Sequence, residues 1–351
     1  MNPDFWRGKK VLVTGHTGFK GAWLSLWISE SGAEVTGYSI DVPTSPSFFE
    51  VAGVADTVRD VRGDIRSADD VHAAVHGAAP EIVFHMAAQS LVRESYLSPV
   101  ETYATNVMGT VHLLEAVRKA ASIRAVVVVT SDKCYENREH SRGYRESDPM
   151  GGRDPYSSSK GCQEIVTSAL RASFFGPENK GTAIASARAG NVIGGGDWAA
   201  DRLVPDAMRA FTRGLPVEIR NPAAVRPWQH VLEPLSGYLL LAERLYAEGN
   251  RWAEGWNFGP LDEDARPVEY MVENLTRGWG NGARWSAPPG KHPHEAGLLK
   301  LDCTKSRTEL GWEPKWRLER AIDAVIAWHR AFSRGMDMRS FSLQQIEDYS
   351  R

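Results

Sequence analysis

Short apolar runs alternate with amphipathic stretches along the first half of the chain. Residues 125–130 read Ala-Val-Val-Val-Val-Thr without polar alternation, which is typical of a parallel strand buried on both faces. The amphipathic stretches between such runs predict helices. This alternation indicates an α/β protein built on a Rossmann-type doubly wound parallel sheet. The other predicted strands cover residues 9–14, 34–38, 81–86 and 182–188, with a strand end near 61–65.

Two of the predicted helices carry apolar stripes at helical spacing. The first spans residues 103–120, and the second begins near Tyr156. Either stripe fits a core helix or a subunit interface, and the pattern leaves both interpretations open. The stripes consist of Val107, Val111, Leu114 and Val117 in the first helix and of Ile165, Ala169 and Ala172 in the second.

Composition and charge narrow the class of protein. With 351 residues, 42% of them hydrophobic, the chain can bury a large core. A net charge of −3 and a pI of about 6.4 argue against a general nucleic-acid binder. Cys134, Cys162 and Cys303 show neither metal-ligand spacing nor a disulfide framework. The sequence also lacks a signal peptide or long apolar run, so we expect a cytoplasmic protein without a metal site or a membrane segment.

A glycine-rich turn follows the first predicted strand. Gly15, Gly18 and Gly21 form a Gly-x-x-Gly-x-x-Gly spacing. Glycines let the backbone approach a diphosphate, and the N-terminus of the following helix favours negative charge. Farther on, the small pair Ala87–Ala88 would let a cofactor pass close to the backbone. We therefore predict a dinucleotide site that includes the residues between the glycines, namely Thr17, Phe19 and Lys20.

Acidic residues after the second and third strands are candidates for contacts with the adenosine half of the dinucleotide. Asp41 lies near the end of the second strand, where a carboxylate would hold the ribose hydroxyls of NAD. Asp41 could instead be a plain loop residue, and Lys20 could tolerate a 2′-phosphate. Because no arginine closely follows this strand, we predict NAD over NADP. Asp64, beside Ile65, could accept a hydrogen bond from the adenine amino group.

The composition changes near residue 190, beyond which tryptophan, proline and arginine become more frequent. We expect residues 1–190 to form the NAD-binding Rossmann domain, to which later segments of the chain can return. Residues 191–351 would then form mainly a smaller, mixed α/β C-terminal lobe that binds the substrate.

Tyr156 and Lys160 form the candidate pair for proton transfer. Pro155 is well placed in the first turn of a helix, so the tyrosine and the lysine lie on one face. A phenol has an ordinary pKa of about 10. A lysine ammonium one turn away and a nearby cationic nicotinamide would both favour the phenolate. The pair therefore predicts a base for an alcohol that is being oxidised.

Two polar clusters indicate where a substrate binds. Residues 130–133 end the central strand, and open α/β sheets bind ligands at the carboxyl ends of their strands. Residues 226–230 read Arg-Pro-Trp-Gln-His. The guanidinium fork of Arg226 matches a diphosphate, and Trp228 can pack against a sugar or a base. Alternatively, Arg226 could pair with a surface carboxylate.

Together, these motifs resemble the extended short-chain dehydrogenase/reductase superfamily, specifically its nucleotide-sugar enzymes, over essentially the whole chain. Residues 130–135, Thr-Ser-Asp-Lys-Cys-Tyr, resemble the 4,6-dehydratase motif Ser-Thr-Asp-Glu-Val-Tyr. Lys133 stands where the dTDP-glucose and GDP-mannose enzymes have glutamate. With that lysine, residues 226–235, 43–50 and 344–349 are similar to the CDP-glucose 4,6-dehydratase family.

The resemblance implies an NAD-dependent lyase that acts on CDP-glucose. Tyr156 would remove the proton of the sugar 4-hydroxyl, with Ser131 hydrogen-bonded to that hydroxyl and Lys160 holding the nicotinamide ribose. Protonated Asp132 would donate to the departing 6-hydroxyl. Lys133 would take the C5 proton if neutral, or stabilise the enolate if charged. By motif position, the nucleotide sugar would contact Ser90, Asn191, Arg226 and Asn257.

Two other functions remain open on the same frame. A nucleotide-sugar 4-epimerase needs Tyr156 and Lys160, but it has no use for charges at Asp132 and Lys133. A catalytically silent dinucleotide-binding scaffold would not need Ser131, Tyr156 or Lys160. We expect a homodimer or homotetramer, without a basis for choosing between them, and neither a nucleic-acid nor a membrane partner.

Overall fold

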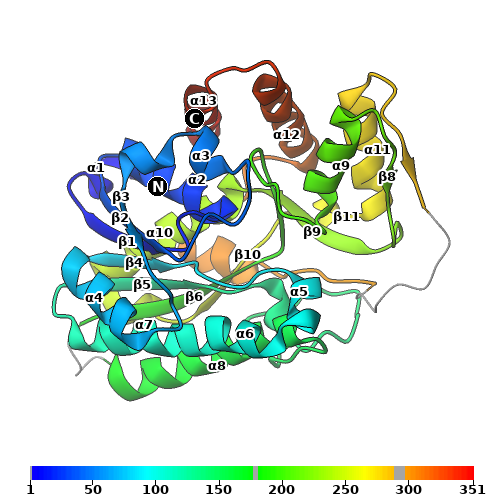
Figure 1. Cartoon of the computed structure of the whole chain (residues 1–351). Helices are drawn as coiled ribbons and strands as arrows, with labels where there is room; N and C mark the ends of the chain where they lie inside the picture. The colour runs from blue at the N-terminus through cyan, green and yellow to red at the C-terminus, as the bar shows by residue number, and fades with distance from the viewer. Residues whose placement is uncertain (1, 177–180, 288–296) are drawn as a thin grey trace.

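The computed structural model describes residues 2–176, 181–287 and 297–351. Its centre is a seven-stranded sheet in the order β10-β6-β5-β4-β1-β2-β3, with parallel pairing throughout (Figure 1). This order confirms the predicted Rossmann-type sheet, and β10 adds a strand from the second half of the chain. The strands are β1 Lys10–Thr14, β2 Glu34–Ser39, β3 Arg59–Arg62, β4 Ile82–His85, β5 Ala125–Val129, β6 Ala183–Ala189 and β10 Gly255–Phe258.

Helices cover both faces of this sheet, so its central strands are apolar on both sides. In β5, Val127 packs into the core cluster that includes α2 (Phe19–Glu30) and α10 (Leu232–Glu248). Val128 packs into the opposite cluster, which includes α4 (Ala68–Ala78) and α7 (Gly109–Lys119). Figure 1 shows α4, α7 and α8 (Pro155–Phe174) in one layer and α2 and α10 in the other. The unbroken valine run in β5 follows from this double burial.

The two helices predicted to carry apolar stripes each differ from the expectation in one respect. The helix expected over 103–120 is interrupted by a π-helical turn, Ala104–Met108, between α6 (Pro99–Tyr103) and α7. Within this turn, Asn106 accepts from the backbone N–H of Gln89 at 2.8 Å and donates to its carbonyl at 2.9 Å. In α8, the stripe faces outward, and Ile165 is 59% exposed. The core interpretation of the α8 stripe is therefore wrong.

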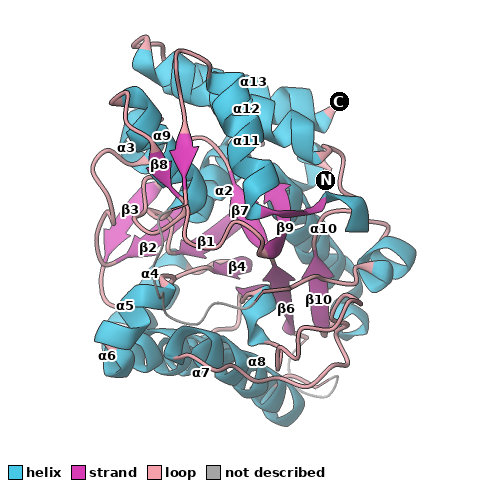
Figure 2. Cartoon of the chain, turned by 90° about the vertical axis from the view of Figure 1, so that its right-hand side faces the viewer, coloured by secondary structure: helices cyan, strands magenta, loops and turns pink. Residues whose placement is uncertain are grey.

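The second half of the chain also builds a smaller lobe beside the carboxyl ends of the main strands (Figures 1 and 2). A three-stranded mixed sheet, β11-β9-β7, and a two-stranded sheet, β12-β8, form its frame. The position of the domain boundary stays a prediction. The strands are β7 Asn191–Ile193, β8 Val217–Glu218, β9 Val225–His230, β11 Ala265–Pro267 and β12 Trp285–Ser286. The remaining α-helices are α1 Pro3–Trp6, α3 Phe48–Val51, α5 Val92–Leu97, α9 Leu203–Thr212, α11 Val268–Trp279, α12 Leu318–Ser333 and α13 Met338–Ser350.

The described residues contain neither a helix that could span a membrane nor a cluster of metal-ligating side chains. None of the described helices combines the length and apolar character needed to cross a bilayer. Across the same ranges, no group of three or more His, Cys, Asp or Glu side chains is arranged to hold a metal ion. Cys134, Cys162 and Cys303 are free thiols.

Candidate functional site

A cavity of about 1180 Å³ opens at the carboxyl ends of the parallel strands. The sheet order reverses between β1 and β4, and open α/β sheets bind ligands at such a switch point. The loops that follow β1 to β6 line one side of the cavity, and the smaller lobe lines the other. Residues from both halves of the chain therefore line the cavity.

The glycine-rich turn lines the cavity at the N-terminus of α2. Gly15 has a φ of 77°, and a β-carbon there would meet the backbone of Ala87 at 2.7 Å. A β-carbon on Gly21 would lie 2.1 Å from the carbonyl oxygen of Gly15. Gly18 is the N-cap of α2 and provides no side-chain cap. The first N–H groups of α2 are thus available to an anion, so the turn fits the diphosphate of a dinucleotide. Thr17, Phe19, Lys20, Ala87 and Ala88 line the same cavity.

The residues predicted to bind adenosine also line the cavity. The Thr17 hydroxyl donates to the carbonyl oxygen of Asp41 at 2.6 Å, and the Asp41 carboxylate accepts from the N–H of Val42 at 2.7 Å. Asp64 forms an ion pair with Arg66 at 2.7 Å, and this contact holds the pKa of the Asp64 carboxyl below its ordinary value. Ile65 lies in the lining beside Asp64. Whether Asp41 and Asp64 bind ribose and adenine stays a prediction.

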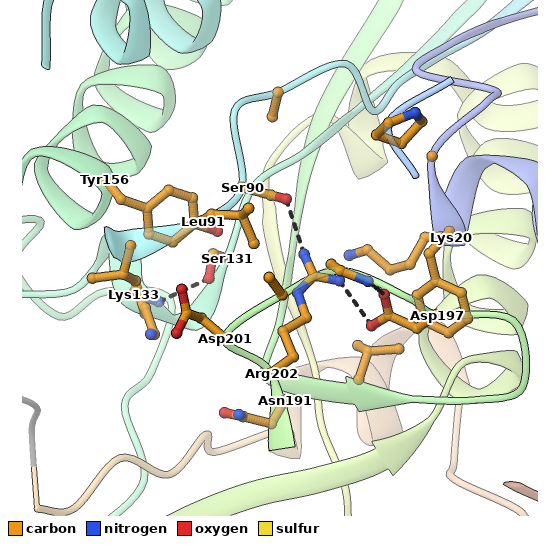
Figure 3. Close-up of a pocket in the computed structure, with 18 of the residues that line it drawn as sticks. Lys20, Ser90, Leu91, Ser131, Lys133, Tyr156, Asn191, Asp197, Asp201 and Arg202 are labelled. Carbon is orange, nitrogen blue, oxygen red and sulfur yellow. Dashed lines mark hydrogen bonds and ion pairs between the residues drawn. The ribbon is translucent and has the colours of Figure 1, made fainter. Parts of the chain in front are cut away.

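Lys20 extends toward the catalytic end of the cavity (Figure 3). Its Nζ lies 5.7 Å from the ring centroid of Tyr238. The pKa of Lys20 is lowered to about 8, mainly by burial and also by the charge of Arg202, while the charge of Asp132 opposes the shift. The Lys20 ammonium therefore lies within range of the charges of Arg202 and Asp132. Whether Lys20 tolerates a 2′-phosphate stays a prediction.

Tyr156 and Lys160 lie on one face of α8. The Asp154 carboxylate caps this helix by accepting from the N–H of Ser157 at 2.8 Å, and Pro155 occupies its first turn. Burial raises the pKa of Tyr156 to about 12, although a hydrogen bond with Ser131 opposes the rise. Burial lowers the pKa of Lys160 to about 7. Burial therefore outweighs the neighbouring groups in setting the pKa of Tyr156, and the expectation that Lys160 and a bound nicotinamide together favour the phenolate stays a prediction.

The turn after β5 brings three further polar residues beside Tyr156. Asp132 is 2% exposed, and its Oδ1 accepts from the Ser131 hydroxyl at 3.0 Å. Its Oδ2 has no hydrogen-bond partner in the described part of the chain. Burial raises the pKa of Asp132, against the opposing charges of Lys133 and Arg226. Lys133 is half-buried, with Nζ 6.0 Å from the Tyr156 ring centroid. The turn thus places a carboxyl of raised pKa and the Lys133 side chain beside the phenol of Tyr156.

Three of the four residues predicted to contact the nucleotide sugar line the cavity: Ser90, Asn191 and Arg226. Arg226 is only 8% exposed, so it is not a surface residue, and its contact with a phosphate stays a prediction. Asn257 lies outside the lining and is fully buried. It accepts from the Tyr135 hydroxyl at 2.7 Å and donates to the carbonyl oxygens of Tyr144 and Asp302. The structure therefore places the first three residues in the cavity lining and Asn257 outside it.

Arg202 is a cavity residue that the motifs did not indicate. It pairs with Asp197 at 2.9 Å and donates to the Ser90 hydroxyl at 2.9 Å (Figure 3). Figure 3 shows Tyr156, Ser131 and Lys133 on one side of the cavity and Lys20 and Asp197 on the other, with Arg202 between them. One sequence feature could have indicated Arg202, namely Asp197, which ends a three-glycine loop five residues before the arginine.

Comparisons with known proteins agree with this geometry. Residues 12–325 match the model of the GDP-mannose 4,6-dehydratase family. The CDP-glucose 4,6-dehydratase of Salmonella typhimurium strain LT2 is 56% identical over 352 residues, which cover 99% of this chain and 98% of the relative. A dTDP-glucose 4,6-dehydratase of Xanthomonas campestris pv. campestris is 25% identical over 374 residues, covering 95% and 98%.

Solved structures share the fold. The UDP-glucose 4-epimerase of Thermus thermophilus, solved with NAD, superposes with a TM-score of 0.79 at 23% identity, covering 91% of this chain and 98% of that one. The dTDP-glucose 4,6-dehydratase of Bacillus anthracis, also solved with NAD, gives a TM-score of 0.76 at 22% identity, covering 93% and 98%. At these identities, the likeness shows the fold and does not separate epimerase from dehydratase.

Proposed function

Because the chain belongs to the GDP-mannose 4,6-dehydratase family, we propose that it converts CDP-glucose to CDP-4-keto-6-deoxyglucose and water. It is a hydro-lyase, and its cofactor is NAD. The observation that carries the choice of CDP-glucose is the 56% identity, over nearly the full length of both chains, to a CDP-glucose 4,6-dehydratase.

The first half-reaction is oxidation at C4 of the sugar. A bound NAD would supply the hydride acceptor for C4 and the hydride donor for C6. Tyr156 takes the proton of the 4-hydroxyl, and Ser131 orients that hydroxyl. Arg202 supplies positive charge near the phenol, and Lys160 would hold the nicotinamide ribose. A bound cationic nicotinamide would add to this charge and oppose the burial that raises the pKa of Tyr156 to about 12.

The second half-reaction is elimination of water across C5 and C6. The 4-keto group acidifies the C5 proton, which Lys133 removes in its neutral form. Asp132 donates a proton to the departing 6-hydroxyl, and a carboxyl whose pKa is raised by burial is suited to that task. In its ammonium form, Lys133 would stabilise the enolate instead.

The diphosphate of CDP-glucose carries negative charge into the part of the cavity that Arg226 and Asn191 line. A guanidinium can hold two phosphate oxygens at once, which favours Arg226 as the main contact. Ser90 contributes a hydroxyl nearby. Asn257 supports this end of the cavity through its hydrogen bonds to Tyr135 and to the backbone.

Incubating the purified protein with CDP-glucose and NAD tests the proposal by product mass spectrometry. The dehydratase removes one water from the sugar nucleotide. A 4-epimerase would give CDP-galactose with unchanged mass, and a non-catalytic scaffold would leave the substrate as it was. A parallel mixture of CDP-, dTDP-, GDP- and UDP-sugars tests the choice of base.

We also propose that the protein is a cytoplasmic homodimer or homotetramer. Large apolar side chains are exposed on α5, α6 and α8, three helices that contact one another, and exposed apolar side chains of this kind can mark an association surface. Light scattering of the purified protein tests the assembly, and cell fractionation tests the location. The side chains are Leu97, Val100 and Ile165, which are 78%, 80% and 59% exposed.

A further inference from the structure

A buried carboxylate lies one turn beyond Lys160 on the same side of α8. Tyr156, Lys160 and Glu164 are spaced four residues apart, so they follow one another along one side of the helix. Glu164 is 5% exposed and lies outside the cavity lining. It accepts from the Thr130 hydroxyl at 2.5 Å.

Glu164 pairs with an arginine from the neighbouring strand. The Arg188 guanidinium, in β6, donates to Glu164 at 2.8 Å, and the Ser186 hydroxyl donates to the same carboxylate oxygen at 2.6 Å. A second nitrogen of Arg188 donates to the Tyr135 hydroxyl at 2.7 Å. Tyr135 in turn donates to Asn257, so the pair belongs to a continuous buried polar network.

This network holds both ends of the turn that carries the acid–base residues. Thr130 immediately precedes Ser131, Asp132 and Lys133, and Tyr135 follows them by two residues. The carboxylate of Glu164 holds Thr130, and the guanidinium of Arg188 holds Tyr135. One ion pair therefore connects the two ends of this turn to the helix that carries the phenol.

Stability alone is a weak reason for such a pair, because well-packed apolar residues often replace a buried ion pair without loss. Its directional contacts, however, define where the turn lies relative to α8. We propose that Glu164 and Arg188 are positioning residues that hold the acid–base turn in register with Tyr156 and Lys160. The inference rests on the proposed dehydratase function, in which one sugar must meet both sets of groups within a single binding event.

Glu164 also contributes charge to the site. Burial alone would raise its pKa, but Arg188 and the hydroxyl donors lower it, so the group is a carboxylate. That negative charge raises the pKa of Lys160, against the larger lowering by burial. Without it, Lys160 would lose its proton at lower pH. A change in the pKa of Lys160 after loss of the Glu164 charge therefore distinguishes a positioning role near the site from a purely structural one.

The test compares Glu164→Gln and Arg188→Met with their double variant and with Arg188→Lys. A displacement on the order of 1 Å can cost about 10²-fold in rate, so we expect kcat of Glu164→Gln to fall by ~10–100-fold with an unchanged KM for CDP-glucose. NADH should persist on the enzyme because oxidation and elimination are no longer in register. The alkaline limb of kcat should move to lower pH, and Arg188→Lys should retain part of the activity that Arg188→Met loses.

Glu233→Gln is the matched control, because Glu233 is another fully buried carboxylate, in α10, paired with Tyr349 and outside the cavity lining. It should lower Tm without moving kcat or the pH profile. If Glu164→Gln fails to fold, the double variant, which leaves no buried charge unpaired, provides the same readouts.

Two outcomes would overturn different claims. An active parent whose folded Glu164→Gln and double variants keep its kcat, NADH level and pH profile overturns the positioning pair alone. A parent that leaves CDP-glucose unchanged overturns the proposed function on which the inference rests.

Discussion

Replacing Tyr156 by phenylalanine removes one hydroxyl from the centre of the site and keeps the buried ring. In the parent, burial raises the pKa of this phenol from 10.0 to about 12. That change corresponds to roughly 3 kcal/mol against the phenolate. Ser131 and Arg202 already oppose the rise, so a bound cationic nicotinamide would have to offset the remaining cost during oxidation. We expect kcat of Tyr156→Phe to fall by at least ~10²-fold, the usual contribution of a general base.

The assay is the appearance of NADH in a single turnover, followed by product formation over many turnovers. Because the base acts in its deprotonated form, parent activity should rise with pH on the acid side, and the variant should lose that dependence. Tyr103→Phe is a matched control, since Tyr103 is 37% exposed on α6 and lies outside the cavity lining. A Tyr156→Phe enzyme with the rate of the control would remove Tyr156 from the mechanism. NAD affinity should stay close to that of the parent, because the glycine-rich turn is untouched.

Three further predictions concern the other contacts. Arg226→Ala should raise KM for CDP-glucose, because it removes a charge-assisted contact that contributes ~1.5–3 kcal/mol of binding free energy. Arg226→Lys should recover only part of this loss. If steady-state kinetics give a parent-like KM for both variants, the diphosphate binds elsewhere. In deuterated water, Lys133→Met should fail to exchange the C5 hydrogen while Asp132→Asn still exchanges it, and both should accumulate NADH; normal exchange by Lys133→Met would assign the base to another group. Activity with NAD should exceed activity with NADP, and Asp41→Ala should narrow the difference; equal activity of the parent with both cofactors would show that Asp41 is not the ribose ligand.

Much of the fold could be predicted because short sequence patterns determine it. The unbroken valines of β5 require burial on both faces, and the helices on either side of the sheet provide it. Gly15 and Gly21 have no room for a β-carbon, so their spacing marked the turn correctly. The Asp154-Pro155 start of α8 also follows from capping chemistry within a few residues.

The remaining features depend on contacts between distant segments. Arg202 enters the site because Asp197 holds it opposite Ser90, a pairing across 112 residues. Asn257 shares a motif position with substrate ligands, but hydrogen bonds to Tyr144 and Asp302 direct its side chain away from the cavity. The pKa of Tyr156 likewise reflects how deeply the whole fold buries it, which a four-residue spacing to Lys160 does not reveal.

The most direct test of the central claim follows hydrogen through one turnover of the parent enzyme. CDP-glucose deuterated at C4 is incubated in ordinary water, and unlabelled CDP-glucose is incubated in deuterated water. The dehydratase account predicts that the C4 label reappears at C6 of the same molecule and that solvent deuterium enters at C5. A label that returns to C4, with no exchange at C5, would contradict that account and identify a 4-epimerase.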